Sequence, residues 1–167
     1  IAAERGFERV DAVRGTVVDA PLPDRVHLVF ALHACDTATD EAIVRAIALG
    51  ADHVAVVPCC QAEVARQLKK LRTEQPIDAL WRAGIHRREF GAHLTNVLRV
   101  LTLRAHGYQV RVTELTGWEH SLKNELIVGR RVAAYHEGAR AERDALLERV
   151  PIDPWLVRAL AASDDRQ

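Results

Sequence analysis

The sequence predicts an α/β protein whose sheet contains parallel strands. Val26–Leu32 is an almost continuous apolar run of strand length, which is typical of a buried parallel strand. A helical pattern of apolar residues follows over 37–50, and Val54–Val57 is a second apolar run. A strand, a helix and a strand of this size form a βαβ unit, whose parallel strands end at the same edge of the sheet.

The segment before this unit contains one further strand signal. Ile1–Arg5 has the composition of a helix tail, which Gly6 can end in a left-handed conformation. Arg9–Arg14 alternates between polar and apolar residues, and this pattern predicts a strand. Pro21 and Pro23 exclude regular pairing, so we expect a loop between this strand and the βαβ unit.

After the unit, helical and strand periodicity alternate to the C-terminus. The segments that we expect are helices over Gln61–Arg72, Ile77–Trp81 and Arg87–His106, strands over Gln109–Thr116 and Glu125–Val132, and helices over Glu137–Arg149 and Pro154–Ala162. Two consecutive strands with a short link are most simply an antiparallel pair at a sheet edge.

Composition limits the class of protein. A chain of 167 residues, 49% of them hydrophobic, can bury one good core. Its net charge of zero gives no general attraction to nucleic acid or membranes, and no apolar run reaches membrane-spanning length. Three cysteines do not make a disulfide framework, which indicates a reducing, cytoplasmic setting. Because the sequence starts at Ile1 and contains no methionine, we expect it to be part of a longer protein.

Reactive side chains follow the first strand of the unit. Ligands bind beyond the carboxyl ends of parallel strands, and His33 and Asp36 stand there. Either residue could position or deprotonate a substrate nucleophile. Alternatively, His33 only packs against a ligand, and Asp36 caps the following helix through the amide of Ala38 or Thr39.

Cysteines gather at the same predicted edge. With His33, the residues Cys35, Cys59 and Cys60 could form a zinc or copper site. However, the spacing differs from that of structural zinc sites, and adjacent cysteines rarely face one ion. We therefore favour reduced, buried cysteines that line a pocket, without a metal. A metal- or thiol-dependent enzyme is the alternative.

Four motifs together resemble a known family. They are ALHACDTATD (31–40), VVPCC (56–60), LTNVLRVLTLRAHGY (94–108) and EHSLKNELI (119–127). They are similar to the methyltransferase-like family that includes the glutathione S-transferase C-terminal domain-containing protein and the ribosomal RNA adenine dimethylase domain-containing proteins. This family has the class I S-adenosylmethionine-dependent methyltransferase fold.

The resemblance implies a Rossmann-like methyltransferase sheet over residues 1–132. Strands three to seven of that fold would be present, with helices on both faces and an antiparallel C-terminal hairpin. Residues 133–167 would form a helical extension packed on this domain. The N-terminal half with the glycine-rich cofactor loop would be absent, because the nine glycines of the chain are scattered.

The resemblance also implies a cofactor and a site. S-adenosylmethionine would bind through Gly15, Thr16, Val17, Leu32, His33 and Ala34, beside Pro58, Cys59 and Cys60 on the substrate side. The family suggests RNA as the substrate of the methyltransferase. The rival interpretation is a non-catalytic module that keeps the fold to bind RNA or a protein.

Two further segments could contact a substrate. The loop before the last strand carries Trp118, His120, Lys123 and Asn124 near the same edge, although Asn124 could simply hold the turn. Residues 61–106 contain nine Arg or Lys and four acids, a surplus that could contact phosphates, with Trp81 and Phe90 stacking on bases. We favour the simpler interpretation of a solvated helix face with core aromatics.

Overall fold

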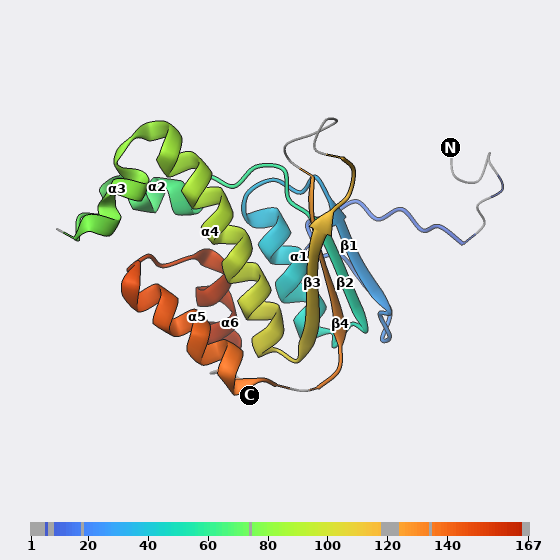
Figure 1. Ribbon diagram of the computed structural model, residues 1–167. Coiled ribbons are helices and arrows are strands. Elements are labelled where there is room, and N and C mark those ends of the chain that lie inside the picture. The colour runs from blue at the N-terminus through green and yellow to red at the C-terminus, as the bar shows by residue number, and fades with distance from the viewer. Residues whose placement is uncertain are drawn as a thin grey trace.

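The computed structural model shows an open sheet with helices packed on it (Figure 1). It describes residues 6, 9–17, 19–73, 75–117, 124–133 and 135–164. The elements are β1 (Leu28–Leu32), α1 (Thr37–Ala48), β2 (His53–Val57), α2 (Glu63–Lys70), a 3₁₀ helix (Pro76–Asp78), α3 (Ala79–Arg82), α4 (Gly84–Ala105), β3 (Tyr108–Glu114), β4 (Glu125–Arg131), α5 (Glu137–Arg149) and α6 (Trp155–Asp164).

The described strands form one four-stranded sheet in the order β1-β2-β4-β3. β1 and β2 are parallel, with Leu28 opposite His53. β4 runs antiparallel to both β2 and β3. The predicted βαβ unit and the antiparallel pairing of the last two strands are therefore confirmed.

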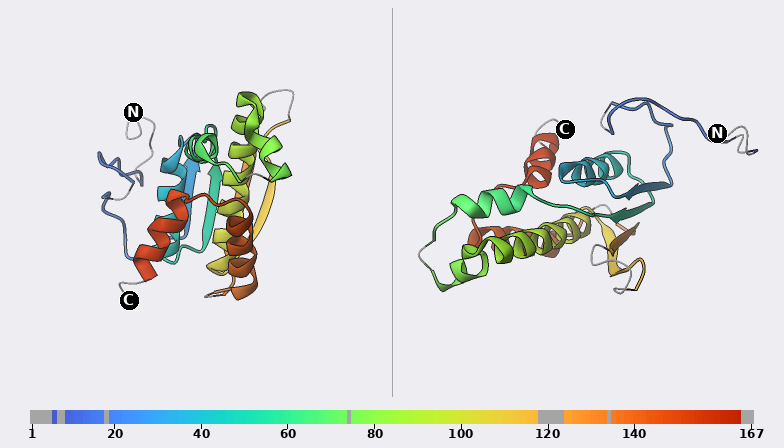
Figure 2. Two further views of the ribbon diagram at one scale, coloured as in Figure 1. Left: turned by 90° about the vertical axis from the view of Figure 1, so that its left-hand side faces the viewer. Right: turned by 90° about the horizontal axis from the view of Figure 1, so that it is seen from above.

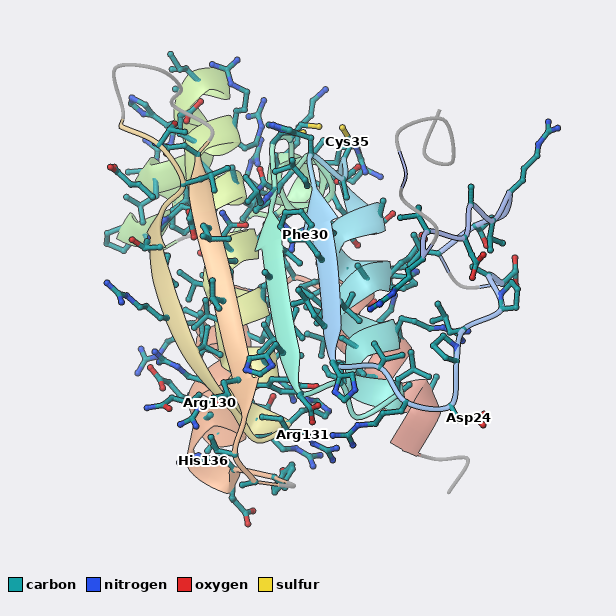
Figure 3. The ribbon with its side chains drawn as sticks, turned by 90° about the vertical axis from the view of Figure 1, so that its right-hand side faces the viewer. Asp24, Phe30, Cys35, Arg130, Arg131 and His136 are labelled. Atoms are coloured by element: carbon teal, nitrogen blue, oxygen red, sulfur yellow. The ribbon has the colours of Figure 1, made fainter. Side chains whose placement is uncertain are left out.

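The helices lie on one face of this sheet (Figure 2). α1 packs against β1 and β2, and α4 packs against β3. On the opposite face, which is turned to the viewer in Figure 3, the β1 side chains of Leu28, Phe30 and Leu32 are 54%, 56% and 49% exposed. The prediction of helices on both faces is therefore wrong for the part of the chain that the structure describes. Alternation along β1 explains the pattern, since every second residue points away from the helices.

Two hydrophobic clusters hold the helices in place. The first joins the sheet to α1, α4 and α6 through residues such as Ile43, Val54, Leu103 and Ile127. The second lies among α2, α3, α4 and the end of α5, around Trp81. The helices after residue 132 thus share the cores of the preceding elements.

Most predicted elements are present with ends shifted by a few residues. The exception is the strand over Arg9–Arg14, which is wrong because this segment has no regular structure. Val10 and Val13 are 57% and 52% exposed, so the alternation there does not reflect a buried face. An alternating pattern becomes a strand only where a neighbouring strand pairs with it.

Within the described residues, no helix combines the length and the apolar composition needed to cross a membrane.

Candidate functional site

The carboxyl ends of β1 and β2 meet at one edge of the sheet, which we call the rim (residues 32–36 and 57–61). Two hydrogen bonds continue the pairing beyond the strands: His33 donates its amide to Val57 at 3.0 Å, and Asp36 donates its amide to Cys60 at 2.7 Å. The juxtaposition predicted from the sequence is therefore confirmed. These bonds fix the relative position of the two loops.

The loop after β1 has an unusual backbone. His33 and Asp36 have φ angles of 54° and 52°, in the left-handed region that disfavours residues other than glycine. Thr39 stabilises the turn between them, since its hydroxyl donates to the Ala34 carbonyl at 2.6 Å. His33 is exposed at the rim, where its ring is accessible to a ligand.

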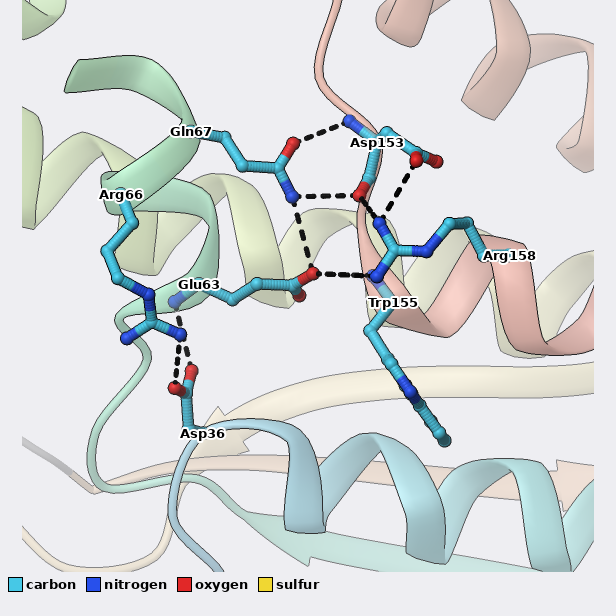
Figure 4. A network of polar contacts seen from close by, with 7 residues as sticks. All are labelled: Asp36, Glu63, Arg66, Gln67, Asp153, Trp155 and Arg158. Carbon is cyan, nitrogen blue, oxygen red and sulfur yellow. Dashed lines mark hydrogen bonds and ion pairs between the residues drawn. The ribbon is translucent and has the colours of Figure 1, made fainter. Parts of the chain in front are cut away.

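Asp36 binds the start of α2 rather than capping α1. Its Oδ1 accepts a hydrogen bond from the amide of Ala62 at 2.9 Å. Oδ1 also accepts one from the amide of Glu63 at 3.0 Å, and Oδ2 accepts one from Arg66 at 2.9 Å (Figure 4). The predicted cap through Ala38 or Thr39 is wrong, because the Asp36 side chain makes no cap hydrogen bond to α1. At φ 52° the side chain is directed across to the neighbouring helix instead.

The environment of Asp36 favours its charged form. Burial opposes ionisation, but the amides of Ala62 and Glu63 and the Arg66 guanidinium together lower the pKa of the carboxyl. A carboxylate with a lowered pKa is a weak base. A catalytic role for Asp36 therefore stays a prediction, whereas its contacts join the β1 loop to α2.

The same end of α2 is tied to the C-terminal helix. Glu63 Oε1 accepts the amide of Trp155 at 2.8 Å, and Arg158 lies 3.6 Å from that oxygen. Gln67 exchanges two hydrogen bonds with the backbone of Asp153, at 2.6 and 2.8 Å (Figure 4). Asp36 thus connects the rim to α2, and Glu63 and Gln67 connect α2 to the start of α6.

The three cysteines lie together at the rim. Cys35 Sγ is 3.5 Å from Cys59 Sγ, and Cys59 Sγ is 3.6 Å from Cys60 Sγ. The prediction that they are buried is wrong, since Cys35 and Cys60 are exposed and Cys59 is half-buried. Hydrogen bonding with Cys60 and Cys59 raises the pKa of Cys35 to about 12, while hydrogen bonds from Cys35 and Cys59 lower the pKa of Cys60.

A small polar cavity of about 160 Å³ lies beside the rim. Its lining residues are Pro58, Gln61, Glu89, Ala92, His93, Asn96 and Glu125. Asn96 connects its walls: it accepts from Gln61 at 2.9 Å and donates to Glu125 at 2.9 Å. Sequence analysis identified only Pro58 here. Gln61 follows it in the rim loop, and the other lining residues come from α4 and β4, where no local motif marks them.

Arg99 contacts Asn96, one of the lining residues of this cavity, and is fully buried. It donates to Asp40 Oδ1 at 2.7 Å, to Asn96 Oδ1 at 3.1 Å and to the Asp36 carbonyl at 3.0 Å. Burial raises the pKa of Asp40, and Arg99 opposes that rise. Arg99 is one of the nine cations counted over residues 61–106. Its inclusion in a basic surface was wrong, since it holds α1, α4 and the rim loop together.

The remaining predicted site residues differ in their placement. Thr16 makes local contacts, with its hydroxyl 2.7 Å from Asp19, and the segment Gly15–Val17 is exposed in an irregular stretch away from the sheet (Figure 1). Asn124 is buried and donates to the Thr116 carbonyl at 2.5 Å, which supports the interpretation that it holds the turn. Trp118, His120 and Lys123 lie outside the described residues.

Trp81 and Phe90 are not available for stacking on bases. Their rings stack on each other with centroids 5.6 Å apart, and Trp81 is 1% exposed within the second hydrophobic cluster. The simpler interpretation of core aromatics is thereby confirmed.

A larger cavity of about 620 Å³ lies at the opposite end of the sheet, between the start of β3 and α5. Its lining includes Tyr108, Val132 and His136. None of the predicted site residues contributes to it, so we place the candidate site at the rim.

Comparison with known proteins gives one match. Residues 1–67 match a family model described as a methyltransferase domain. The matched segment contains β1, α1, β2 and the whole rim, and it supports a methyltransferase domain. No curated protein and no solved structure matches the chain.

Proposed function

We propose that this chain contributes to an S-adenosylmethionine-dependent methyltransferase with its reactive site at the rim. The observation that carries the proposal is the methyltransferase-domain match over 1–67, which includes both rim loops. The strand order β1-β2-β4-β3, with β4 antiparallel to its neighbours, supports a Rossmann-like methyltransferase sheet. Ligands of such sheets bind beyond the carboxyl ends of the parallel strands.

The exposed part of the rim fits one edge of the cofactor. Leu32 is 49% exposed, and His33 and the half-buried Ala34 continue from it, so apolar and polar groups are both accessible there. These three residues would hold the cofactor. When bound, S-adenosylmethionine supplies an electrophilic methyl group.

His33 would accept a proton at a ring nitrogen while the substrate nucleophile is methylated. An imidazole is suited to this task because its ring nitrogen can accept a proton and then release it. Asp36 would act as a positioning residue, since its bonds to α2 hold the loop that carries His33. The cavity lined by Gln61, His93 and Asn96 would accept the polar edge of the substrate.

RNA is the substrate class that we propose. Exposed cations lie on α2, directly after it, on α3 and on α4: Arg66, Lys69, Lys70, Arg72, Arg82 and Arg88. Positive charges near a reactive site attract phosphates without specifying a sequence. Base recognition would then come from the cavity, whose side chains offer hydrogen-bond donors and acceptors.

Titration calorimetry with S-adenosylhomocysteine tests the cofactor assignment. We expect the protein to bind it and His33→Ala to weaken binding about fivefold, the equivalent of one hydrogen bond of about 1 kcal/mol. His27→Ala is the matched control, because His27 precedes β1 at the opposite end and contacts Asp52 at 2.8 Å. Equal weakening by both substitutions, or no binding by the folded protein, would refute the assignment.

The placement of Gly15–Val17 favours a second candidate function. These residues, which were expected to approach the cofactor, lie in an exposed irregular segment. A non-catalytic module would need only the sheet and its charged helices to bind RNA. This function predicts RNA binding that does not change when S-adenosylhomocysteine is added. The methyltransferase function predicts that the protein binds both RNA and S-adenosylhomocysteine.

A further inference from the structure

We propose that Cys35, Cys59 and Cys60 form a binding site for Zn²⁺, with three thiolate ligands and an open fourth position. The site is independent of the methyltransferase proposal, because it depends only on the arrangement of the three sulfur atoms. It replaces the interpretation of the cysteines as buried pocket residues without a metal.

The distances between the sulfur atoms suit one ion. All three Sγ atoms lie within 4.8 Å of one another, and Cys59 Sγ is 3.5 Å from Cys35 Sγ and 3.6 Å from Cys60 Sγ. Zinc binds thiolates at about 2.3 Å in a tetrahedral arrangement, which places two sulfur ligands about 3.8 Å apart. Only small adjustments of the side chains would bring the three sulfurs onto a common centre.

The backbone holds the ligands in position without an ion. Hydrogen bonds from His33 to Val57 and from Asp36 to Cys60 join the two cysteine-bearing loops. The Asp36 carboxylate secures the same loop to the amides of Ala62 and Glu63. A site with ligands already in place loses little conformational entropy when the metal binds.

The chemistry of the cluster also favours a soft metal ion. Thiolates select zinc among the divalent cations of low redox activity. Each thiol gives up its proton to solvent as its Zn–S bond forms, so the three sulfurs bind as thiolates. Among the described residues, no His or acidic side chain joins the cluster within the same distance. The fourth position would therefore hold water or an incoming ligand, as in zinc sites that act on substrates.

Binding of Zn²⁺ and Co²⁺ to the reduced protein under anaerobic conditions tests the site. We expect one Zn²⁺ per chain, and Co²⁺ should give the near-ultraviolet sulfur-to-cobalt absorption and the intense visible bands of a tetrahedral thiolate site. Loss of a partner outside the ligand set typically weakens metal binding 10–100-fold. Loss of a ligand itself should cost more than loss of such a partner. Each single Cys→Ser substitution should therefore weaken Zn²⁺ binding by at least about 100-fold.

The triple variant Cys35→Ser, Cys59→Ser, Cys60→Ser removes every thiol of the chain. Ala34→Ser is the matched control, because it adds a hydroxyl at the same loop and keeps all three sulfurs. Circular dichroism shows whether each variant is folded. Zinc affinity that survives in the folded triple variant, or a reduced folded protein that gives no cobalt–thiolate absorption, would overturn the proposal.

Discussion

Arg99→Met is expected to destabilise the protein by about 3–5 kcal/mol, because it leaves Asp40 buried without its positive partner. Arg99 is 0% and Asp40 3% exposed, and their contact measures 2.7 Å. The substitution also removes the donors to Asn96 and to the rim loop. Chemical denaturation followed by circular dichroism measures the free energy of unfolding.

The pH dependence of this loss identifies its cause. Burial raises the pKa of Asp40 in the native protein, and removal of Arg99 would raise it further. The folded variant then binds a proton that its unfolded state does not bind at the same pH, so its stability rises as the pH falls. The destabilisation should accordingly be smaller at pH 5 than at pH 8.

Arg66→Met is the matched control for Arg99→Met. Arg66 forms a similar ion pair with Asp36 at 2.9 Å, but its side chain is 63% exposed, and exposed pairs contribute at most about 1 kcal/mol. Equal losses for the two variants would contradict the importance that we assign to burial of the Arg99 pair.

Trp81→Ala is expected to cost about 3–5 kcal/mol of stability, the usual loss for removing a large aromatic side chain from a core. Trp81 is 1% exposed and packs with Phe90, Leu98 and Val150 in the second hydrophobic cluster. Thermal and chemical denaturation measure the loss.

Leu80→Ala is the control, since Leu80 lies on the same short helix and is 47% exposed. Its effect on stability should be small. If Trp81→Ala instead left stability unchanged and weakened RNA binding, Trp81 would be a stacking residue, and its assignment to the core would be wrong.

The sequence predicted those parts of the fold that depend on local patterns. The apolar runs of β1 and β2 and the helix between them predicted the parallel pair and its rim. The expected burial of β1 was wrong, since its residues alternate between exposed and half-buried, whereas β2 is buried at Val54, Val56 and Val57. The helical periodicity of residues 137–149 gave α5 with the observed ends. The strand over Arg9–Arg14 failed because strand formation also needs a partner, which alternation does not reveal.

The candidate site was only partly predictable for a similar reason. Proximity of Cys35 to Cys59 follows from parallel strands, and the sequence indicated it. The positive φ of Asp36 sends its carboxylate to α2 instead of α1, and no residue type signals that choice. Burial of Arg99 depends on Asp40, which lies 59 positions away, so a charge count treats it as a surface residue.

Transfer of an isotopically labelled methyl group from S-adenosylmethionine tests the central claim most directly. The protein is incubated with labelled cofactor and total cellular RNA, and the RNA is digested to nucleosides for mass spectrometry. The account predicts label in a nucleoside, reduced by a factor of about 100 or more in His33→Ala, since a positioned general base typically contributes that much. Absence of label from RNA, protein and small-molecule fractions alike would contradict the claim that this chain takes part in methyl transfer.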